Sequence, residues 1–180
     1  RRLIDEHGHT QEAVARGVRV RIAVHDPEAG HGRSATPPSS RPALLEATGA
    51  DVRLIDGDGD LMHHKFAVRD GAAVWSGSAN WTLDSWTRQE NVIATLASEP
   101  LARNFSRVFE ELWQRRHIQD TADFDTQPVR VGDAHVRAWF CPGRGRELAH
   151  RIAMRIERAR RRVRIASPVI TSAPVLGALA

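Results

Sequence analysis

The sequence predicts an α/β fold in which a mixed β-sheet is flanked by helices. Short alternating runs of β-branched residues predict strands, and VRVRIAV over residues 18–24 is the clearest of them. Apolar side chains at helical spacing predict a helix over 100–116. Two short apolar strands joined by Asp70-Gly71 predict a hairpin within 61–80, because this dipeptide tolerates the positive φ angles of a tight turn.

The other elements are justified by local signals along the chain. Helix-favouring residues closed by Gly17 predict the end of a helix over 1–17. A polar Gly/Pro/Ser stretch, GHGRSATPPSSRP, predicts a surface loop over 30–42. The remaining expected elements are a short helix after Pro42, strands over 51–56 and 92–96, a hairpin over 129–140, a helix over 147–162, a strand over 163–167 and a helix over 171–180.

Two helices are expected to have contrasting faces. The helix over 100–116 should bury one stripe, formed by Leu101, Phe105, Val108, Phe109, Leu112 and Trp113. The helix over 147–162 should turn Leu148, Ile152, Ile156 and Ala159 inward and carry a basic stripe of Arg151, Arg155, Arg158 and Arg162. That stripe could contact phosphates, but we favour a solvated face.

The predicted hairpin concentrates polar groups on one face. Alternation along a strand places His63, Lys65 and Ala67 on one side, opposite the mostly apolar set of Met62, His64, Phe66 and Val68. If the returning strand keeps its alternation, the shared polar face also carries Ser76, Ser78 and Asn80. An imidazole, an ammonium, hydroxyls and a carboxamide together suit an anion that is surrounded by oxygen atoms.

Lys65 is the only lysine among the 26 lysines and arginines of the chain. A lysine is a compact charge on a flexible stem, whereas an arginine is a wide planar fork. A packed phosphate pocket can require the compact charge, and we favour this reading over chance.

The stretch from His63 to Asn91 resembles the signature of the phospholipase D superfamily. His63, Lys65 and Asp70 follow the order H-x-K-x4-D, and Gly77-Ser78-Ala79-Asn80 gives G-S-x-N. Gln89-Glu90-Asn91 then precedes an apolar strand, as in that superfamily. The resemblance implies a phospholipase D-like αβα sandwich and a phosphodiesterase that needs no metal or cofactor.

The resemblance also implies roles for the motif residues. A histidine such as His63 attacks phosphorus and forms a phosphohistidine, while the histidine of a second motif acts as the general acid; the sequence leaves open which role is His63's. Lys65 and Asn80 would bind phosphoryl oxygens, and Ser78 would add a hydrogen bond within the site. Glu90 would accept a hydrogen bond from His63. Asp70 belongs to the motif, but at the turn we favour a structural role.

The same resemblance predicts the domain organisation. Residues 1–116 look like the C-terminal part of one phospholipase D-like repeat, which carries the motif, and 129–180 look like the N-terminal part of a second repeat. Residues 117–128 are expected to form a linker. A second H-x-K motif is then expected beyond Ala180, or alternatively from a homodimer partner.

Composition constrains the partners. The formal net charge of +4 and the isoelectric point near 10.7 favour polyanions, namely nucleic acid or an anionic membrane surface, although a high arginine count can also reflect base composition. Cys141 is the single cysteine, so no internal disulfide is expected. No apolar run reaches the length of a membrane span. The compartment stays open, and a cytoplasmic or peripheral membrane location is favoured.

Three classes of function therefore stay open. The first is a phospholipase D-type enzyme that hydrolyses or transfers phosphatidyl groups, the second is a metal-independent endonuclease with the same chemistry, and the third is a non-catalytic phosphate-binding module. A zinc site at His63 and His64 is disfavoured, because adjacent strand residues face opposite ways. The acidic stretch 56–60 is expected to be a turn without metal, since Leu61 replaces the glycine of a calcium loop and Ala67 replaces its glutamate.

Overall fold

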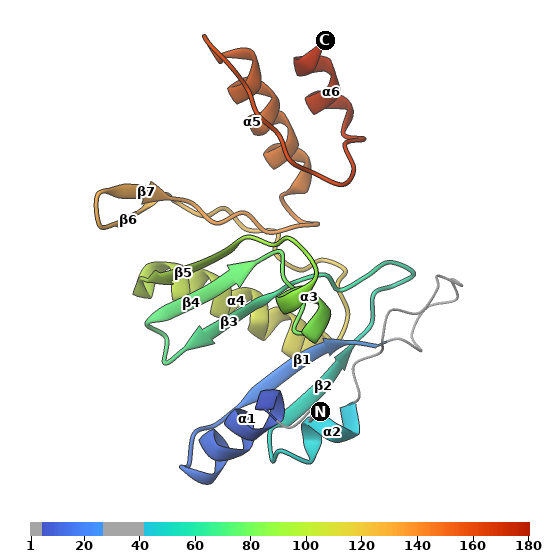
Figure 1. Ribbon diagram of the computed structural model, residues 1–180, viewed down its shortest axis with the longest axis vertical. Helices are drawn as coiled ribbons and strands as arrows, with labels where there is room; N and C mark the ends of the chain where they lie inside the picture. The colour runs from blue at the N-terminus through green and yellow to red at the C-terminus, as the bar shows by residue number, and fades with distance from the viewer. Residues whose placement is uncertain (1–4, 27–41) are drawn as a thin grey trace. The chain divides into compact units, whose positions relative to one another are not determined.

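The chain forms two compact units, residues 1–119 and 120–180, in a computed structural model that describes residues 5–26 and 42–180 (Figure 1). The expected loop over 30–42 lies, up to Arg41, outside the described residues. The first unit contains α1 (Asp5–Ala15), β1 (Arg21–His25), α2 (Pro42–Glu46), β2 (Asp51–Ile55), β3 (Phe66–Arg69), β4 (Ala73–Gly77), α3 (Leu83–Thr87), β5 (Ile93–Ala97) and α4 (Glu99–Arg115). The second contains β6 (Val129–Val131), β7 (Ala134–Val136), α5 (Gly145–Glu157) and α6 (Ala173–Leu179). The α/β class is confirmed.

The strands of the first unit form one parallel and one antiparallel sheet. β1 and β2 run parallel, with Arg21 opposite Asp51 and His25 opposite Ile55. β3, β4 and β5 form an antiparallel sheet in that order. Both kinds of pairing occur because the β3–β4 link is a tight turn, whereas β1 and β2 are separated by a connection long enough to include α2.

Helix α4 holds the two sheets of the first unit together. Ser98 caps its N-terminus and Arg116 ends it in the left-handed conformation. The expected apolar stripe is confirmed: Leu101, Val108, Leu112 and Trp113 are buried, and Phe105 and Phe109 are half-buried. Against β1 and β2, Arg21 donates to the carboxylate of Glu110, and the guanidinium of Arg53 lies 4.3 Å from the centre of the Trp113 ring.

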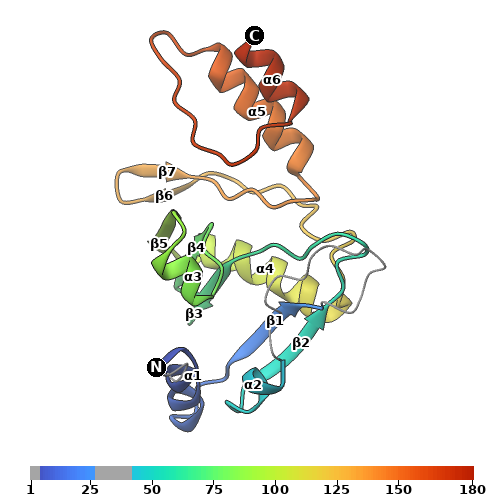
Figure 2. The ribbon, with the colours of Figure 1, turned by 45° about the vertical axis from the view of Figure 1, so that its right-hand side comes forward.

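The two faces of the β3–β4–β5 sheet differ in what covers them. Phe66 lies opposite Ser76 and contacts Phe105 of α4, with 5.1 Å between ring centres. Trp75 lies opposite Ala67, so its side chain points to the other face, where it meets Trp86 of α3 at 6.0 Å. Helices α3 and α4 therefore lie on opposite faces of this sheet (Figures 1 and 2).

The register corrects the expected polar face. Directly opposed residues of an antiparallel pair point to the same side. Ser76 therefore shares the face of Phe66 and not that of Lys65, so the expectation that Ser76 lies beside Lys65 is wrong. Gly77 is the residue opposite Lys65, and its N–H donates to the Lys65 carbonyl oxygen at 3.3 Å.

Several expected boundaries are also wrong. β3 begins at Phe66 and not at Leu61, because β4 ends at Gly77 and Ser78 instead pairs with Val92. β1 begins at Arg21 and not at Val18. The helix expected over 147–162 ends at Glu157, and 163–167 form no strand, since no strand in the described part of the chain pairs with them.

The second unit combines the expected hairpin with two packed helices. β6 and β7 pair across a turn in which Gly132 has φ of 58°. Residues 120–128 contain no helix or strand, yet Thr121, Ala122 and Phe124 are buried. α5 packs on α6.

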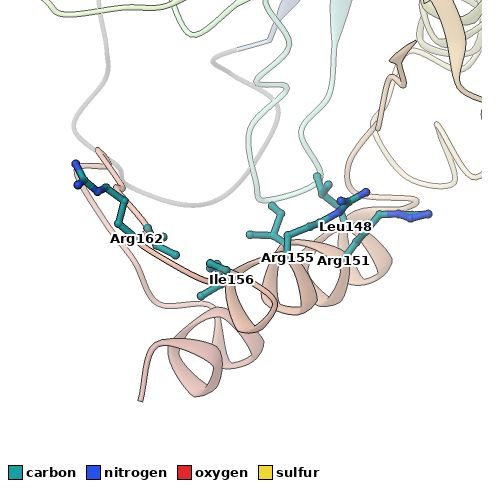
Figure 3. A pocket seen from close by; sticks show the side chains of 8 residues that line it. Leu148, Arg151, Arg155, Ile156 and Arg162 are labelled. Carbon is teal, nitrogen blue, oxygen red and sulfur yellow. The ribbon is translucent and has the colours of Figure 1, made fainter. Parts of the chain in front are cut away.

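A concave surface of about 470 Å³ lies along α5 and the segment after it (Figure 3). Arginine and apolar side chains alternate along it: Leu148, Arg151, Ile152, Arg155, Ile156, Ala159, Arg162 and Val163. The solvated basic face is confirmed at Arg155, Arg158 and Arg162. The expectation that Ile152 and Ala159 point inward is wrong, because 43% of Ile152 remains exposed and Ala159 is exposed beyond the end of α5.

Candidate active site

The candidate site begins where the chain enters β3. Residues 61–65 have no regular secondary structure, and β3 starts directly after Lys65. Asp70 and Gly71 turn the chain at the far end of the hairpin with φ values of 53° and 64°, which confirms the expected tight turn. The hairpin therefore presents His63 and Lys65 at one end and its turn at the other.

Lys65 is buried beside His63. Only 9% of Lys65 is exposed, and its Nζ donates to the carbonyl oxygen of His63 at 2.8 Å. Burial lowers the pKa of Lys65, because removing an ammonium from water disfavours its charged form. The hydrogen bond fixes the position of the charge, and the other N–H groups of Nζ are candidates for binding phosphoryl oxygens.

The imidazole of His63 is exposed and favours its neutral form. Partial burial lowers the pKa of His63, and the neighbouring charge of Lys65 lowers that pKa further. A neutral imidazole has a free nitrogen lone pair, which nucleophilic attack requires. The pair therefore combines a candidate nucleophile with a fixed positive charge that would attract an anionic group.

His64 has a different environment from its neighbour. Its ring meets the edge of Phe66 at 5.6 Å between ring centres, on the side of the hairpin where Phe66 contacts α4. Burial, followed by the charges of Lys65 and His63, lowers the pKa of His64. His64 thus packs with the core, while His63 is exposed to solvent.

Ser78 belongs to a hydrogen-bond network that the sequence did not reveal. Its hydroxyl donates to Oδ1 of Asn91 at 2.9 Å and accepts from the N–H of Val92 at 3.0 Å. The side chain of Asn91 donates in turn to the carbonyl oxygens of Ser85 and Gln89. The hydroxyl proton of Ser78 is therefore used in the hydrogen bond to Asn91. The network joins the end of β4 to α3 and β5. The Gln-Glu-Asn triplet before a strand was the signal that could have identified Asn91.

The remaining motif residues occupy different parts of the hairpin region. Asn80 is exposed and follows the fully buried Ala79. Glu90 is exposed, and the described residues show no hydrogen bond between Glu90 and His63, so that contact stays a prediction. At about 3.3 Å per strand residue, Asp70 lies roughly 17 Å along the chain from Lys65. This distance supports a structural role for Asp70.

Aromatic side chains lie on the sheet face that Lys65 shares. Trp75 contacts Trp81 at 4.7 Å between ring centres, and it also contacts Trp86. Trp81 is 57% exposed and Leu83 of α3 is 62% exposed. Trp75, Trp81 and Trp86 therefore do not fill a closed core in the described part of the chain, and they provide apolar surface on this face.

The acidic stretch over 56–60 is a turn. The N–H of Asp58 bonds to the side chain of Asp56 at 2.7 Å, and the N–H of Asp60 bonds to the Gly57 carbonyl oxygen at 2.9 Å. The described ranges contain no group of three or more side chains arranged to bind a metal ion. They also contain no helix that is both long and apolar enough to cross a membrane.

Gly77 is required by the close approach of the strand beside it. A methyl group at Gly77 would lie 2.2 Å from the carbonyl oxygen of Val92, which is backbone and cannot rotate away. We expect Gly77→Ala to lower the free energy of unfolding by about 1–3 kcal/mol. Urea denaturation followed by circular dichroism measures this loss. Gly177→Ala, which adds a methyl group in open space, is the matched control, and an unchanged urea midpoint for Gly77→Ala would refute the steric argument.

The fold is that of the phospholipase D superfamily. Residues 9–113 match the family described as cardiolipin synthase, phospholipase D-like domain, and the chain belongs to this family. The crystal structure of Nuc, a phospholipase D family member from Salmonella typhimurium, has a similar fold, with a TM-score of 0.50 and 24% sequence identity over 61% of this chain and 69% of that one.

Curated relatives share the same region. The mitochondrial cardiolipin hydrolase of Xenopus tropicalis is 37% identical over 118 residues, which are 64% of this chain and 50% of that protein. The human mitochondrial cardiolipin hydrolase is 38% identical over 56% of this chain and 37% of its own length. The virion nicking-joining enzyme of monkeypox virus is 32% identical over 54% of this chain and 22% of its own length. The chain thus spans half the length of these relatives or less.

Proposed function

We propose that this chain carries one half of a phospholipase D-type phosphodiesterase site, which hydrolyses or transfers phosphatidyl groups through a phosphohistidine intermediate. The observation that carries the proposal is the contact between an exposed His63 and the buried Lys65, whose Nζ donates to the His63 carbonyl oxygen at 2.8 Å. The motif residues are intact, which disfavours a binding module without activity.

In the proposed first step, a ring nitrogen of His63 attacks the phosphorus atom and the bond to the leaving oxygen breaks. Lys65 and Asn80 bind the phosphoryl oxygens and stabilise their increasing negative charge. The leaving oxygen takes a proton from the histidine of the second motif. Water, or an alcohol in the transfer reaction, then attacks the phosphohistidine, gives its proton to that second histidine and releases His63.

The proposed reaction also needs the histidine of a second H-x-K motif. Either a further H-x-K motif in a longer chain or His63 of a second copy would supply it. In a symmetric pair both histidines would be His63, one acting as nucleophile and the other as acid. Analytical ultracentrifugation distinguishes the two arrangements.

Two observations bear on the substrate. The exposed ring of Trp81 contacts Trp75, which lies on the sheet face that Lys65 shares, and this apolar surface favours a phosphodiester attached to apolar chains. Two of the relatives are named cardiolipin hydrolases. The basic charge of the chain and the viral nicking-joining relative support a nuclease as the second candidate.

The test is hydrolysis of bis(p-nitrophenyl) phosphate in buffer containing EDTA. We expect activity that EDTA does not reduce. Lys65 and the amide donors of the site would stabilise the negative charge on the phosphoryl oxygens, which a metal ion does in other enzymes. Cardiolipin vesicles and single-stranded DNA, assayed side by side, then identify the substrate, and we expect faster cleavage of the lipid. Abolition of activity by EDTA would overturn the metal-independent mechanism, and cleavage of DNA alone would select the nuclease.

A further inference from the structure

His25 is a second histidine close to the candidate site, outside the H-x-K motif. It is the last residue of β1 and lies opposite Ile55, which is fully buried at the end of β2. The parallel pairing of β1 and β2 therefore fixes the backbone of His25. A ring at this position can act as a rigid support for the loop that follows β2.

The ring of His25 contacts that loop at two points. Its Nδ1 accepts a hydrogen bond from the backbone N–H of Met62 at 3.4 Å. Its Cε1 lies over Gly57, where an added methyl group would be only 3.0 Å away. Gly57 is buried, and an added methyl group would also lie 2.3 Å from the Asp60 carbonyl oxygen, so the turn beside the ring is tightly packed. The packing and the hydrogen bond together orient Nδ1 towards Met62.

His63 lies between two backbone anchors. The first is the Met62 N–H bonded to His25, and the second is the Lys65 carbonyl oxygen bonded to the N–H of Gly77 at 3.3 Å. Between these anchors, 61–65 belong to no strand. Lys65 adds the bond from its Nζ to the His63 carbonyl oxygen. Without the first anchor, the backbone on the N-terminal side of His63 would lose its link to β1.

We propose that His25 is a positioning residue that orients His63 by holding the backbone of Met62. To accept at Nδ1, the neutral ring carries its proton on Nε2. An exposed nucleophile on a loop gains from such a constraint, because misplacing a reacting group by about 1 Å costs on the order of 10²-fold in rate. The catalytic consequence rests on the proposed phosphodiesterase function, whereas the structural contact does not.

Three substitutions test this role. The side-chain oxygen of His25→Asn can take the place of Nδ1, whereas the oxygen of His25→Gln lies one carbon further out, and His25→Leu has no acceptor. NMR measures amide hydrogen exchange at Met62 and the ring signals of His63. We expect exchange at Met62 to quicken about 2- to 10-fold in His25→Leu and His25→Gln, the range that one hydrogen bond provides, and to stay near the wild-type rate in His25→Asn.

Kinetics provide the second readout. With bis(p-nitrophenyl) phosphate, kcat should fall in His25→Leu and His25→Gln with little change in KM, and His25→Asn should restore it. Unchanged Met62 exchange and unchanged His63 signals in both His25→Leu and His25→Gln would overturn the proposal. If His25→Leu fails to fold, His25→Gln against His25→Asn gives the same comparison. A protein that is inactive in every form refutes the proposed function, while the exchange data still decide the role of His25.

Discussion

Replacing His63 by asparagine is expected to lower phosphodiesterase kcat by at least about 10³-fold, because asparagine offers no nitrogen nucleophile and no proton for the leaving group. Whichever of the two roles His63 takes, the reaction loses an essential group. The imidazole is exposed, so we expect the substitution to leave the fold and its urea midpoint unchanged. Steady-state hydrolysis of bis(p-nitrophenyl) phosphate measures the loss.

His135→Asn is the matched control for this substitution. His135 is also an exposed histidine, and it lies in β7 of the second unit, outside the motif. We expect His135→Asn to keep the wild-type kcat. Wild-type activity in His63→Asn would remove His63 from the mechanism, and an equal loss in both variants would show that the effect is not specific to the site.

Replacing Lys65 by methionine is expected to lower kcat by about 10²- to 10³-fold, the cost of removing one donor that stabilises charge in a transition state. Methionine keeps a similar length and fits a position that is only 9% exposed. Lys65→Arg should also be impaired, because the buried position must then hold a wide planar fork instead of a compact ammonium. Activity of Lys65→Arg equal to that of the wild type would contradict the need for the compact charge.

Stability should change in the opposite direction from activity. Burial lowers the pKa of Lys65, so the folded state binds this proton less tightly than the unfolded state. Stability therefore rises with pH from the lowered pKa up to the ordinary lysine value, and at neutral pH the buried ammonium is a cost. Lys65→Met removes that cost and loses the bond to the His63 carbonyl oxygen, so we expect an unfolding midpoint at least as high as that of the wild type.

The same variant changes the pKa of His63. The charge of Lys65 contributes to lowering that pKa, so Lys65→Met should raise it towards the ordinary histidine value. An NMR titration of the His63 ring protons measures the shift. If His63 is the nucleophile, the acid limb of kcat/KM in the wild type should have its midpoint below the ordinary histidine pKa, because protonation removes the attacking lone pair. An unchanged His63 titration in Lys65→Met would show that the two groups do not interact.

Local sequence signals predicted the hairpin turn and the helix α4. Asp70-Gly71 adopts the positive φ angles that its composition indicated, and Leu101, Val108 and Leu112 form the buried stripe that their spacing indicated. Both features depend on residues close together in the chain, so periodicity and turn chemistry are sufficient to find them.

Features that depend on distant partners were not predictable in the same way. The face of Ser76 and the start of β3 depend on which residue of β4 lies opposite which residue of β3, and a shift of one residue exchanges the faces. The contact between His25 and Met62 joins residues 37 positions apart, through a loop whose path the sequence does not specify. The bond between Ser78 and Asn91 likewise depends on how β4 and β5 align.

The proposed covalent intermediate at His63 is tested most directly by mass spectrometry of protein quenched in alkali during turnover, since phosphohistidine survives base. We predict a peptide in which His63 carries the phosphoryl group of the substrate, and we predict its absence from His63→Asn. Turnover by the wild-type protein with His63 unmodified, and with the label on another residue or on none, would contradict the assignment of His63 as the nucleophile.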